Sequence, residues 1–245
     1  MVLRIKFRKY GPIRFIGHLD VMRFFQKLNR RAELDVAYSG GFSPHQIMSF
    51  AAPLGVGLES NGEYMDLQVH SIVSCEDVRE RMNAASVPGI EVVDVKILPE
   101  NAGNAMASVA AASYTVRFRE GREPDFMQNK PMEEVLGAFL QRESICITKE
   151  TKKSVREVDL KPGIYEFTWD KDAFHMLVDA SSSGNIKPAQ IFQALLADHG
   201  ETLKENALVI TREDTFTDIG ENGEQRLVPL NDIGMDDAAK KGAEA

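Results

Sequence analysis

The sequence predicts an α+β fold in which two similar units follow one another along the chain. Short segments with alternating apolar and polar residues, typical of half-buried strands, are separated by segments with helical spacing. The first unit has the order strand, helix, strand, strand, helix, strand, and the second has a similar order with an extra hairpin. This order is typical of the ferredoxin-like βαββαβ arrangement with an antiparallel sheet. We therefore expect ferredoxin-like units at residues 1–100 and 108–215, followed by a disordered acidic tail at 216–245.

The first unit begins with a clear strand pattern. From Val2 to Tyr10, the apolar residues Leu3, Ile5 and Phe7 alternate with charged ones. Beyond Gly11 and Pro12 the spacing becomes helical. The elements after this point are predicted as a helix over His18–Ala32, strands over Leu34–Tyr38, Ile47–Leu54 and Glu63–Val69, a helix over Glu76–Ala85 and a strand over Ile90–Leu98.

The second unit is predicted to begin after a small, polar joint at Glu100–Ala107. Lys161–Gly163 is expected to turn a hairpin between strands at Val155–Leu160 and Ile164–Trp169. Pro188 suits the first turn of a helix. The other predicted elements are strands over Ser113–Phe118, Ile145–Lys149, Ala173–Val178 and Ala207–Thr211, and helices over Met132–Arg142 and Pro188–Ala197.

Charge is distributed unevenly along the chain. The net charge is -8, yet residues 1–31 hold nine basic residues and one acidic residue, a balance of +8. Residues 213–245 hold nine acidic and three basic residues, a balance of -6. A basic segment on an acidic protein predicts a local polyanion site, and the acidic tail is either a solvated end or a competitor for that site.

Composition favours a cytoplasmic protein. No apolar run reaches the length of a membrane span, and the N-terminus lacks the apolar core of a secretion signal. Cys75 and Cys146 match no metal or redox spacing, so two free thiols in a reducing compartment are expected. No glycine pattern of a nucleotide site occurs, and we expect no cofactor.

The first candidate cluster lies where the first predicted helix begins. His18 and Asp20 are near its N-terminus, where free backbone N–H groups favour an anion, and Arg14 would add a clamp for phosphate or carboxylate. The alternative is structural, with Asp20 capping the helix and His18 packing at its start. The helix also presents a basic face that is either a phosphate-binding surface or a solvated one, formed by Arg23, Lys27, Arg30 and Arg31.

The second candidate cluster is a glycine-hinged loop with the sequence Gly41-Phe42-Ser43-Pro44-His45. Glycine lets a backbone turn sharply and approach a ligand closely. His18, Asp20 and His45 are the candidate catalytic residues, because imidazole titrates near neutral pH. Their residue types would also suit a metal, although no spacing requires one, and we expect none. The loop residues are expected to contact a ligand or RNA, with structural turns as the alternative.

Three stretches together resemble a bacterial radical-SAM-linked domain of unknown function. They are KYGPIRFIGHLDVMR, AYSGGFSPHQIMSFAAPLGVGLES and GEYMDLQV, and the resemblance extends over most of residues 1–215. It implies association with a radical SAM protein in trans and a link to ribosome-related genes. The chain has no CxxxCxxC motif, so the iron–sulfur cluster would belong to the partner.

Three functions remain open from the sequence. In the first, the protein is an accessory module that presents RNA or a ribosomal component to a radical SAM enzyme, with phosphate contacts from the basic residues. In the second, it is an enzyme with a His/Asp acid–base or metal-assisted site that acts in RNA modification. In the third, it is a protein–protein scaffold.

Overall fold

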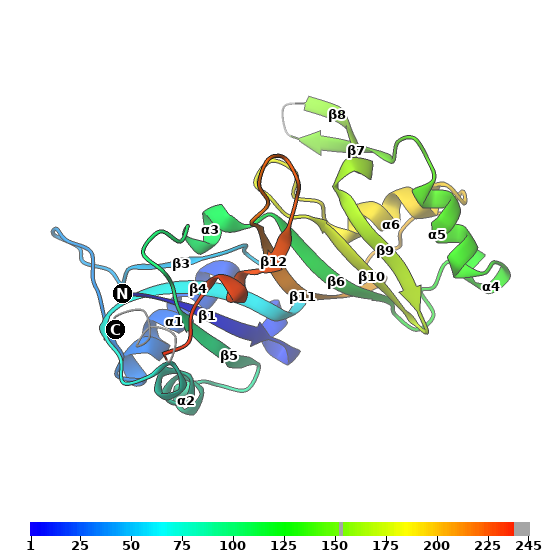
Figure 1. Cartoon of the computed structure of the whole chain (residues 1–245). Coiled ribbons are helices and arrows are strands. Elements are labelled where there is room, and N and C mark those ends of the chain that lie inside the picture. The colour runs from blue at the N-terminus through cyan, green and yellow to red at the C-terminus, as the bar shows by residue number, and fades with distance from the viewer. Residues whose placement is uncertain (152–153, 238–245) are drawn as a thin grey trace. The chain divides into compact units, whose positions relative to one another are not determined.

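The computed structural model describes residues 1–151 and 154–237 and divides the chain into two units (Figure 1). Unit 1 consists of Met1–Ala110 and the C-terminal segment from Arg212, and unit 2 consists of Ala111–Thr211. The fold is a mixed α+β fold with mostly antiparallel pairing, and the described residues form six α-helices. Each unit has its own hydrophobic core.

Unit 1 is built around the antiparallel strands β5, β1 and β4, in that order. Short strands β2 and β3 also pair with β4, and β12 pairs with β11, which begins in unit 2 and ends in unit 1. The elements of unit 1 are β1 (Val2–Lys9), the 3-10 helix η1 (Gly11–Phe15), α1 (His18–Arg31), β2 (Asp35–Val36), β3 (Met48–Phe50), β4 (Glu59–Ser71), α2 (Cys75–Ala85), β5 (Ile90–Ile97), α3 (Ala105–Ser108), β11 (Leu208–Asp218), β12 (Leu227–Pro229) and η3 (Leu230–Ile233).

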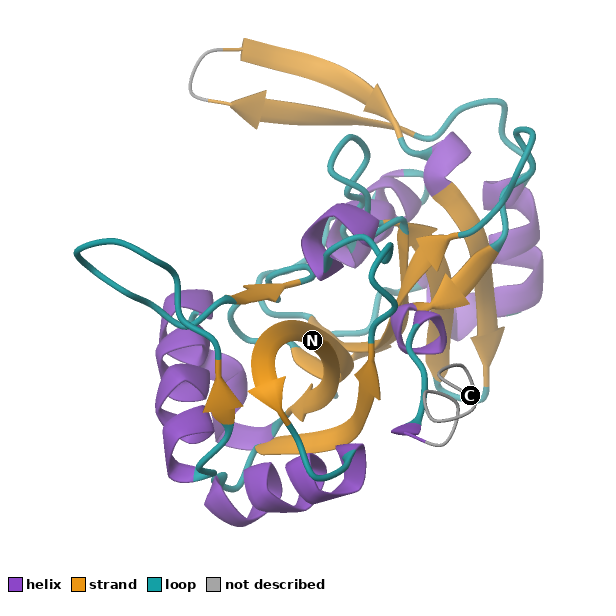
Figure 2. Ribbon diagram, turned by 60° about the vertical axis from the view of Figure 1, so that its left-hand side comes forward, coloured by secondary structure: helices purple, strands orange, loops and turns teal. Residues whose placement is uncertain are grey.

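The core of unit 1 reflects the alternation seen in β1. Leu3, Ile5 and Phe7 share one face of β1 and belong to one core with residues of α1 and α2. Helices cover this side of the sheet (Figure 2). Phe7 and Phe25 pack with their ring centroids 4.6 Å apart. The opposite face of β1 carries charged residues, and the partners of these residues decide how much of their positive charge is left at the surface.

Unit 2 contains antiparallel strands with helices packed against their core. Strands β6, β10 and β9 are neighbours in that order, and β11 lies beside β6. Phe167, Phe174 and Phe192 form the aromatic centre of the core. The elements are β6 (Ala111–Phe118), α4 (Phe126–Asn129), α5 (Met132–Leu140), β7 (Cys146–Thr151), β8 (Ser154–Asp159), the 3-10 helix η2 (Lys161–Gly163), β9 (Ile164–Asp170), β10 (Ala173–Asp179) and α6 (Pro188–Ala197).

The predicted hairpin around Lys161–Gly163 is wrong. That segment is a 3-10 turn, β8 pairs with β7, and β9 pairs with β10. The tight turn lies instead at Lys171, whose φ of 58° gives the left-handed conformation that two-residue hairpins need. Strands expected at Leu34–Tyr38 and Ile47–Leu54 are real but shorter.

The prediction of a disordered tail from residue 216 is wrong for residues 216–237. Leu230 is fully buried and anchors the segment on unit 1. Met235 exchanges two backbone hydrogen bonds with Ile97 of β5. A few apolar residues therefore hold a segment whose acidic composition favours disorder; residues 238–245 lie outside the described part of the chain.

The segment expected to be a joint between the units, Glu100–Ala107, is partly helical. Its C-terminal part forms the start of α3, and the backbone N–H of Ala105 donates to the Asp66 carboxylate. Cys75 and Cys146 are not joined by a disulfide. Among the described residues, no helix has both the length and the apolar character needed to cross a membrane.

Candidate functional site

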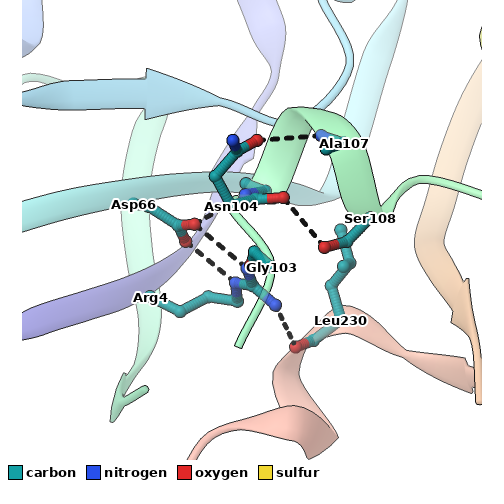
Figure 3. A network of polar contacts seen from close by, with 8 residues as sticks. Arg4, Asp66, Gly103, Asn104, Ala107, Ser108 and Leu230 are labelled. Carbon is teal, nitrogen blue, oxygen red and sulfur yellow. Dashed lines mark hydrogen bonds and ion pairs between the residues drawn. The ribbon is translucent and has the colours of Figure 1, made fainter. Parts of the chain in front are cut away.

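The charged face of β1 is occupied by an internal network centred on Arg4 (Figure 3). Arg4 is completely buried, and its Nε and Nη2 atoms donate to the two oxygens of Asp66 at 2.9 and 3.0 Å. Its guanidinium also donates to the carbonyls of Gly103 and Leu230, both at 3.2 Å. Buried charge needs this degree of pairing, so Arg4 has a structural role.

The other cations of β1 also have partners within unit 1. Lys6 forms an ion pair with Asp214 at 2.7 Å, and Arg8 forms one with Glu91 at 3.2 Å. Together with the Arg4–Asp66 pair, these ion pairs neutralise three of the positive charges in the segment that the sequence marks as basic. The face of β1 therefore contributes little free positive charge.

Lys9 is buried at the end of β1 and holds the first motif in place. Its Nζ donates to the carbonyls of Arg14 and Ile16, at 3.4 and 3.0 Å. Burial lowers the pKa of Lys9 below its ordinary value, and the nearby Glu63 carboxylate opposes this shift. Glu63 is itself paired with Arg212 at 2.9 Å. The position of η1 thus depends on a buried ammonium group.

Arg14, predicted as a phosphate clamp, has an internal partner. Its Nη1 donates to Glu59 at 2.9 Å, and the same carboxylate oxygen accepts a hydrogen bond from the Gly11 N–H. The Gly57 N–H donates to the Arg14 carbonyl. Arg14 therefore ties η1 to the loop that precedes β4, and an anion would have to compete with Glu59 for it.

His18 is half-buried at the start of α1 and faces the core. Its ring meets Phe50 edge to face, with centroids 5.4 Å apart. Both rings line a cavity of about 20 Å³ together with Lys9 and Glu63. Such a volume suits a single water molecule, so it is not a substrate pocket in this conformation.

Asp20 does not fill the capping role that was one of its two predicted alternatives. Gly17 is the N-cap of α1, and no side chain caps the helix there. Asp20 lies exposed in the first turn, 3.4 Å from the guanidinium of Arg23. At this position a carboxylate interacts favourably with the helix dipole.

His45 closes the second motif into a loop. The ring Nδ1 of His45 lies 2.9 Å from Ser39 Oγ, and the backbone N–H of His45 donates to the same oxygen at 3.1 Å. The Ser39 N–H donates back to the His45 carbonyl at 2.9 Å. These contacts fix the ends of the loop at Ser39 and His45, which accounts for a histidine here without any acid–base role.

The three candidate catalytic residues have separate contacts. His18 lines the small cavity, Asp20 is paired with Arg23 at the surface, and His45 is bonded to Ser39. The described part of the chain contains no group of three or more His, Cys, Asp or Glu side chains arranged to hold a metal. A shared site formed by these three residues has no geometric support.

The loop between Ser39 and His45 projects from unit 1 (Figure 2). Gly41 has a φ of 96°, which lets the chain reverse, and the next residue, Phe42, has a relative exposure of 112%. Ser43 and Pro44 are also exposed. The phenyl ring at the tip is therefore accessible to another molecule.

The base of this loop rests on α1 through a residue that the sequence did not single out as functional. Gln46 is buried, accepts a hydrogen bond from Asn29 at 2.9 Å and donates to the Gln26 carbonyl at 3.0 Å. Because Gln26 and Asn29 belong to α1, the loop and that helix are held together. No pattern in the sequence marks an isolated glutamine as an anchor.

The basic face of α1 keeps free charge at its C-terminal half. Lys27 and Arg30 are exposed, and neither forms an ion pair with any described residue. Arg31 donates to the Ala85 carbonyl at the end of α2, and Arg23 is paired with Asp20. Of the nine cations in residues 1–31, Lys27 and Arg30 are therefore the most available to an external anion.

A separate hollow of about 950 Å³ lies in unit 1 and was not expected from the sequence. Its apolar lining includes Met1, Met48 and Met235. Asp66 contributes a carboxylate, but Arg4 and the Ala105 N–H already satisfy it. The charge of Asp66 is therefore compensated within unit 1, and it gives no indication of the ligand that this hollow would bind.

Comparison with known proteins identifies a family. Over residues 3–188 the chain matches DUF2344, described as an uncharacterized protein conserved in bacteria. No curated protein matches the chain. A crystal structure of a Cbf5-Nop10-Gar1 complex is similar, with 9% sequence identity and a TM-score of 0.45. The similarity covers 87% of this chain and 48% of the chain in that complex, so this chain spans about half of that chain's length. Because residues 3–188 make up most of its 245 residues, the chain belongs to the bacterial family DUF2344.

Proposed function

We propose that this protein is a binding module for RNA and that the surface formed by α1 and the Ser39–His45 loop makes the contact. One observation carries the proposal: Lys27 and Arg30 of α1 are exposed and have no ion-pair partner among the described residues. The same helix holds the base of the loop that carries Phe42, through the hydrogen bond between Asn29 and Gln46. Cations would hold phosphates, and an exposed phenyl ring would stack on an unpaired base. The combination favours single-stranded RNA over a protein partner or a small molecule.

The proposal extends to the architecture and the partner. The chain order β1, α1, β3, β4, α2, β5 with β1 between β5 and β4 supports a ferredoxin-like unit 1, and β6, α5, β9, β10, α6, β11 supports a related unit 2. The three motifs that resemble the radical-SAM-linked domain support a radical SAM protein as the partner. Co-purification of the two proteins tests that association, and its absence would remove the partner without affecting RNA binding.

An acid–base enzyme is less well supported as the function. Its strongest argument is the buried Lys9 and Glu63 beside His18, but the cavity of about 20 Å³ would have to open before a substrate could enter. A scaffold role draws on exposed apolar side chains at Phe15, Leu19 and Val56. These residues would fit a protein surface, yet they do not explain the free cations.

The test is fluorescence anisotropy with a labelled single-stranded poly(U) RNA of about twenty nucleotides, at several salt concentrations. The wild-type protein is expected to bind with an affinity that falls steeply between about 50 mM and about 200 mM salt. The double variant Lys27→Gln/Arg30→Gln is expected to lower the slope of log K against log salt by about 1.4, since each lost phosphate contact removes about 0.7.

The matched control is Arg8→Gln/Arg79→Gln. It removes the same charge from unit 1, but from arginines already paired with Glu91 and Glu76. The control should keep the wild-type slope. Absence of salt-dependent binding by the wild-type protein, or equal losses in the two double variants, would overturn the proposal.

A further inference from the structure

The β7–β8 ribbon of unit 2 presents its charges on two different faces. The two strands pair with each other and form a sheet of their own among the described strands (Figure 2). In an antiparallel pair, residues directly opposite one another point to the same face. Ile147 opposes Val158, and Lys149 opposes Arg156, so all four share one face of the ribbon.

This face has an apolar base and a cationic end. Ile147 and Val158 pack against the core of unit 2 and fix the base of the ribbon. Lys149 and Arg156 lie two residues closer to the tip, and neither forms an ion pair with a described residue. The opposite face carries Glu157, which is exposed and lies opposite Thr148.

The cationic end of this ribbon is unfavourable when no anion faces it, because like charges placed directly opposite one another destabilise the pair. A continuous row of phosphates would reverse the effect of the Lys149–Arg156 pair, because both cations would then face negative charge. The position of Glu157 also favours an anion, because this carboxylate is on the opposite face and is directed away from the two cations.

We infer that the β7–β8 ribbon is a second phosphate-binding element and that Lys149 and Arg156 contact the RNA backbone. The inference rests on the proposed function and deepens it. The ribbon belongs to unit 2 and the α1 surface to unit 1, and each would contribute phosphate contacts of its own. The ribbon contributes affinity and not sequence specificity, because phosphate contacts carry no base information.

The experiment compares Lys149→Gln/Arg156→Gln with Arg117→Gln/Arg142→Gln in the same poly(U) titration. The control removes equal charge from unit 2, at arginines paired with Asp172 and Asp198. The ribbon variant is expected to bind about tenfold more weakly at low salt and to lower the salt slope by about 1.4, and the control should stay within about twofold of the wild type. The conservative variant Lys149→Arg should bind like the wild type.

The outcomes separate the two proposals. If the wild-type protein binds no RNA, the proposed function fails and the ribbon inference fails with it. If the α1 variant loses affinity and the ribbon variant binds like its control, the ribbon inference alone is overturned. Circular dichroism at equal protein concentration checks that the variants fold. The ribbon variant is expected to fold, because its substitutions remove the repulsion between Lys149 and Arg156.

Discussion

Strand β1 and helix α1 each contribute four cations to the first 31 residues. Those of β1 are Arg4, Lys6, Arg8 and Lys9, and those of α1 are Arg23, Lys27, Arg30 and Arg31. Every cation of β1 has an internal acceptor, whereas two of the four on α1, Lys27 and Arg30, have no acceptor among the described residues. Equal charge in the sequence therefore leads to very different surface charge.

The difference arises from the position of each element. Strand β1 lies between β4 and β5, and strand register places a partner beside each of two cations: Arg4 opposes Asp66, and Arg8 opposes Glu91. The exposed face of α1 receives no carboxylate from a neighbouring strand among the described residues. Central strands neutralise their charges, and the outward face of a helix leaves its charges to solvent or to a partner.

The largest expected effect is on stability and tests the β1 side of this comparison. Arg4→Met leaves Asp66 buried without its cation, so the free energy of unfolding should fall by about 3–5 kcal/mol. Lys27→Met, an exposed change on α1, should alter it by less than about 0.5 kcal/mol. Urea denaturation measures both.

A double variant sharpens the result for β1. Arg4→Met/Asp66→Leu removes both charges and should recover part of the loss, although the Ala105 N–H then lacks its acceptor. Equal unfolding free energies for Arg4→Met and Lys27→Met would show that the two elements do not differ in the way proposed.

The second prediction concerns binding at the exposed side. Phe42→Ala should weaken poly(U) binding by about 1–3 kcal/mol, the usual value of one base stacked on an aromatic ring, and should leave stability unchanged. Phe15→Ala is the matched control, because Phe15 is also exposed in a motif but lies under the Arg14 guanidinium. Equal affinity for wild type and Phe42→Ala would remove the stacking role.

Much of unit 1 could be predicted from the sequence because its signals are local. Alternation marked β1, helical spacing marked α1, and the glycine-hinged loop was located within a few residues. The pairing of β8 was not predictable, since Lys161–Gly163 has the composition of a hairpin turn yet forms a 3-10 turn. Composition likewise concealed the anchoring by Leu230.

The candidate site was predicted only in part, for a physical reason. Its residue types could be read from the sequence, but their partners come from distant segments: Asp214 is 208 residues from Lys6. Whether a cation is free depends on such pairings. Gln46, which joins the loop to α1, carries no charge or spacing that would distinguish it.

The smallest expected effect concerns the acidic C-terminal segment, which the sequence left as either a solvated end or a competitor for the basic surface. Asp237 accepts a hydrogen bond from the Cys75 N–H at the start of α2, and Asp236 is paired with Lys96. Burial, together with the smaller effect of the Asp237 charge, raises the pKa of Cys75 to about 12. The segment thus contacts α2 and β5.

Asp237→Ala should therefore cost about 1 kcal/mol of stability, as the loss of a helix N-terminal acceptor does, and should leave poly(U) affinity unchanged. Asp236→Ala removes the same charge from an exposed pair and should cost less than about 0.5 kcal/mol. Thermal unfolding and the anisotropy titration measure the two properties in parallel. A rise in RNA affinity in both variants would mean that the acidic segment competes for the cations of α1, and the contrast between β1 and α1 would then describe one state of the protein and not its only state.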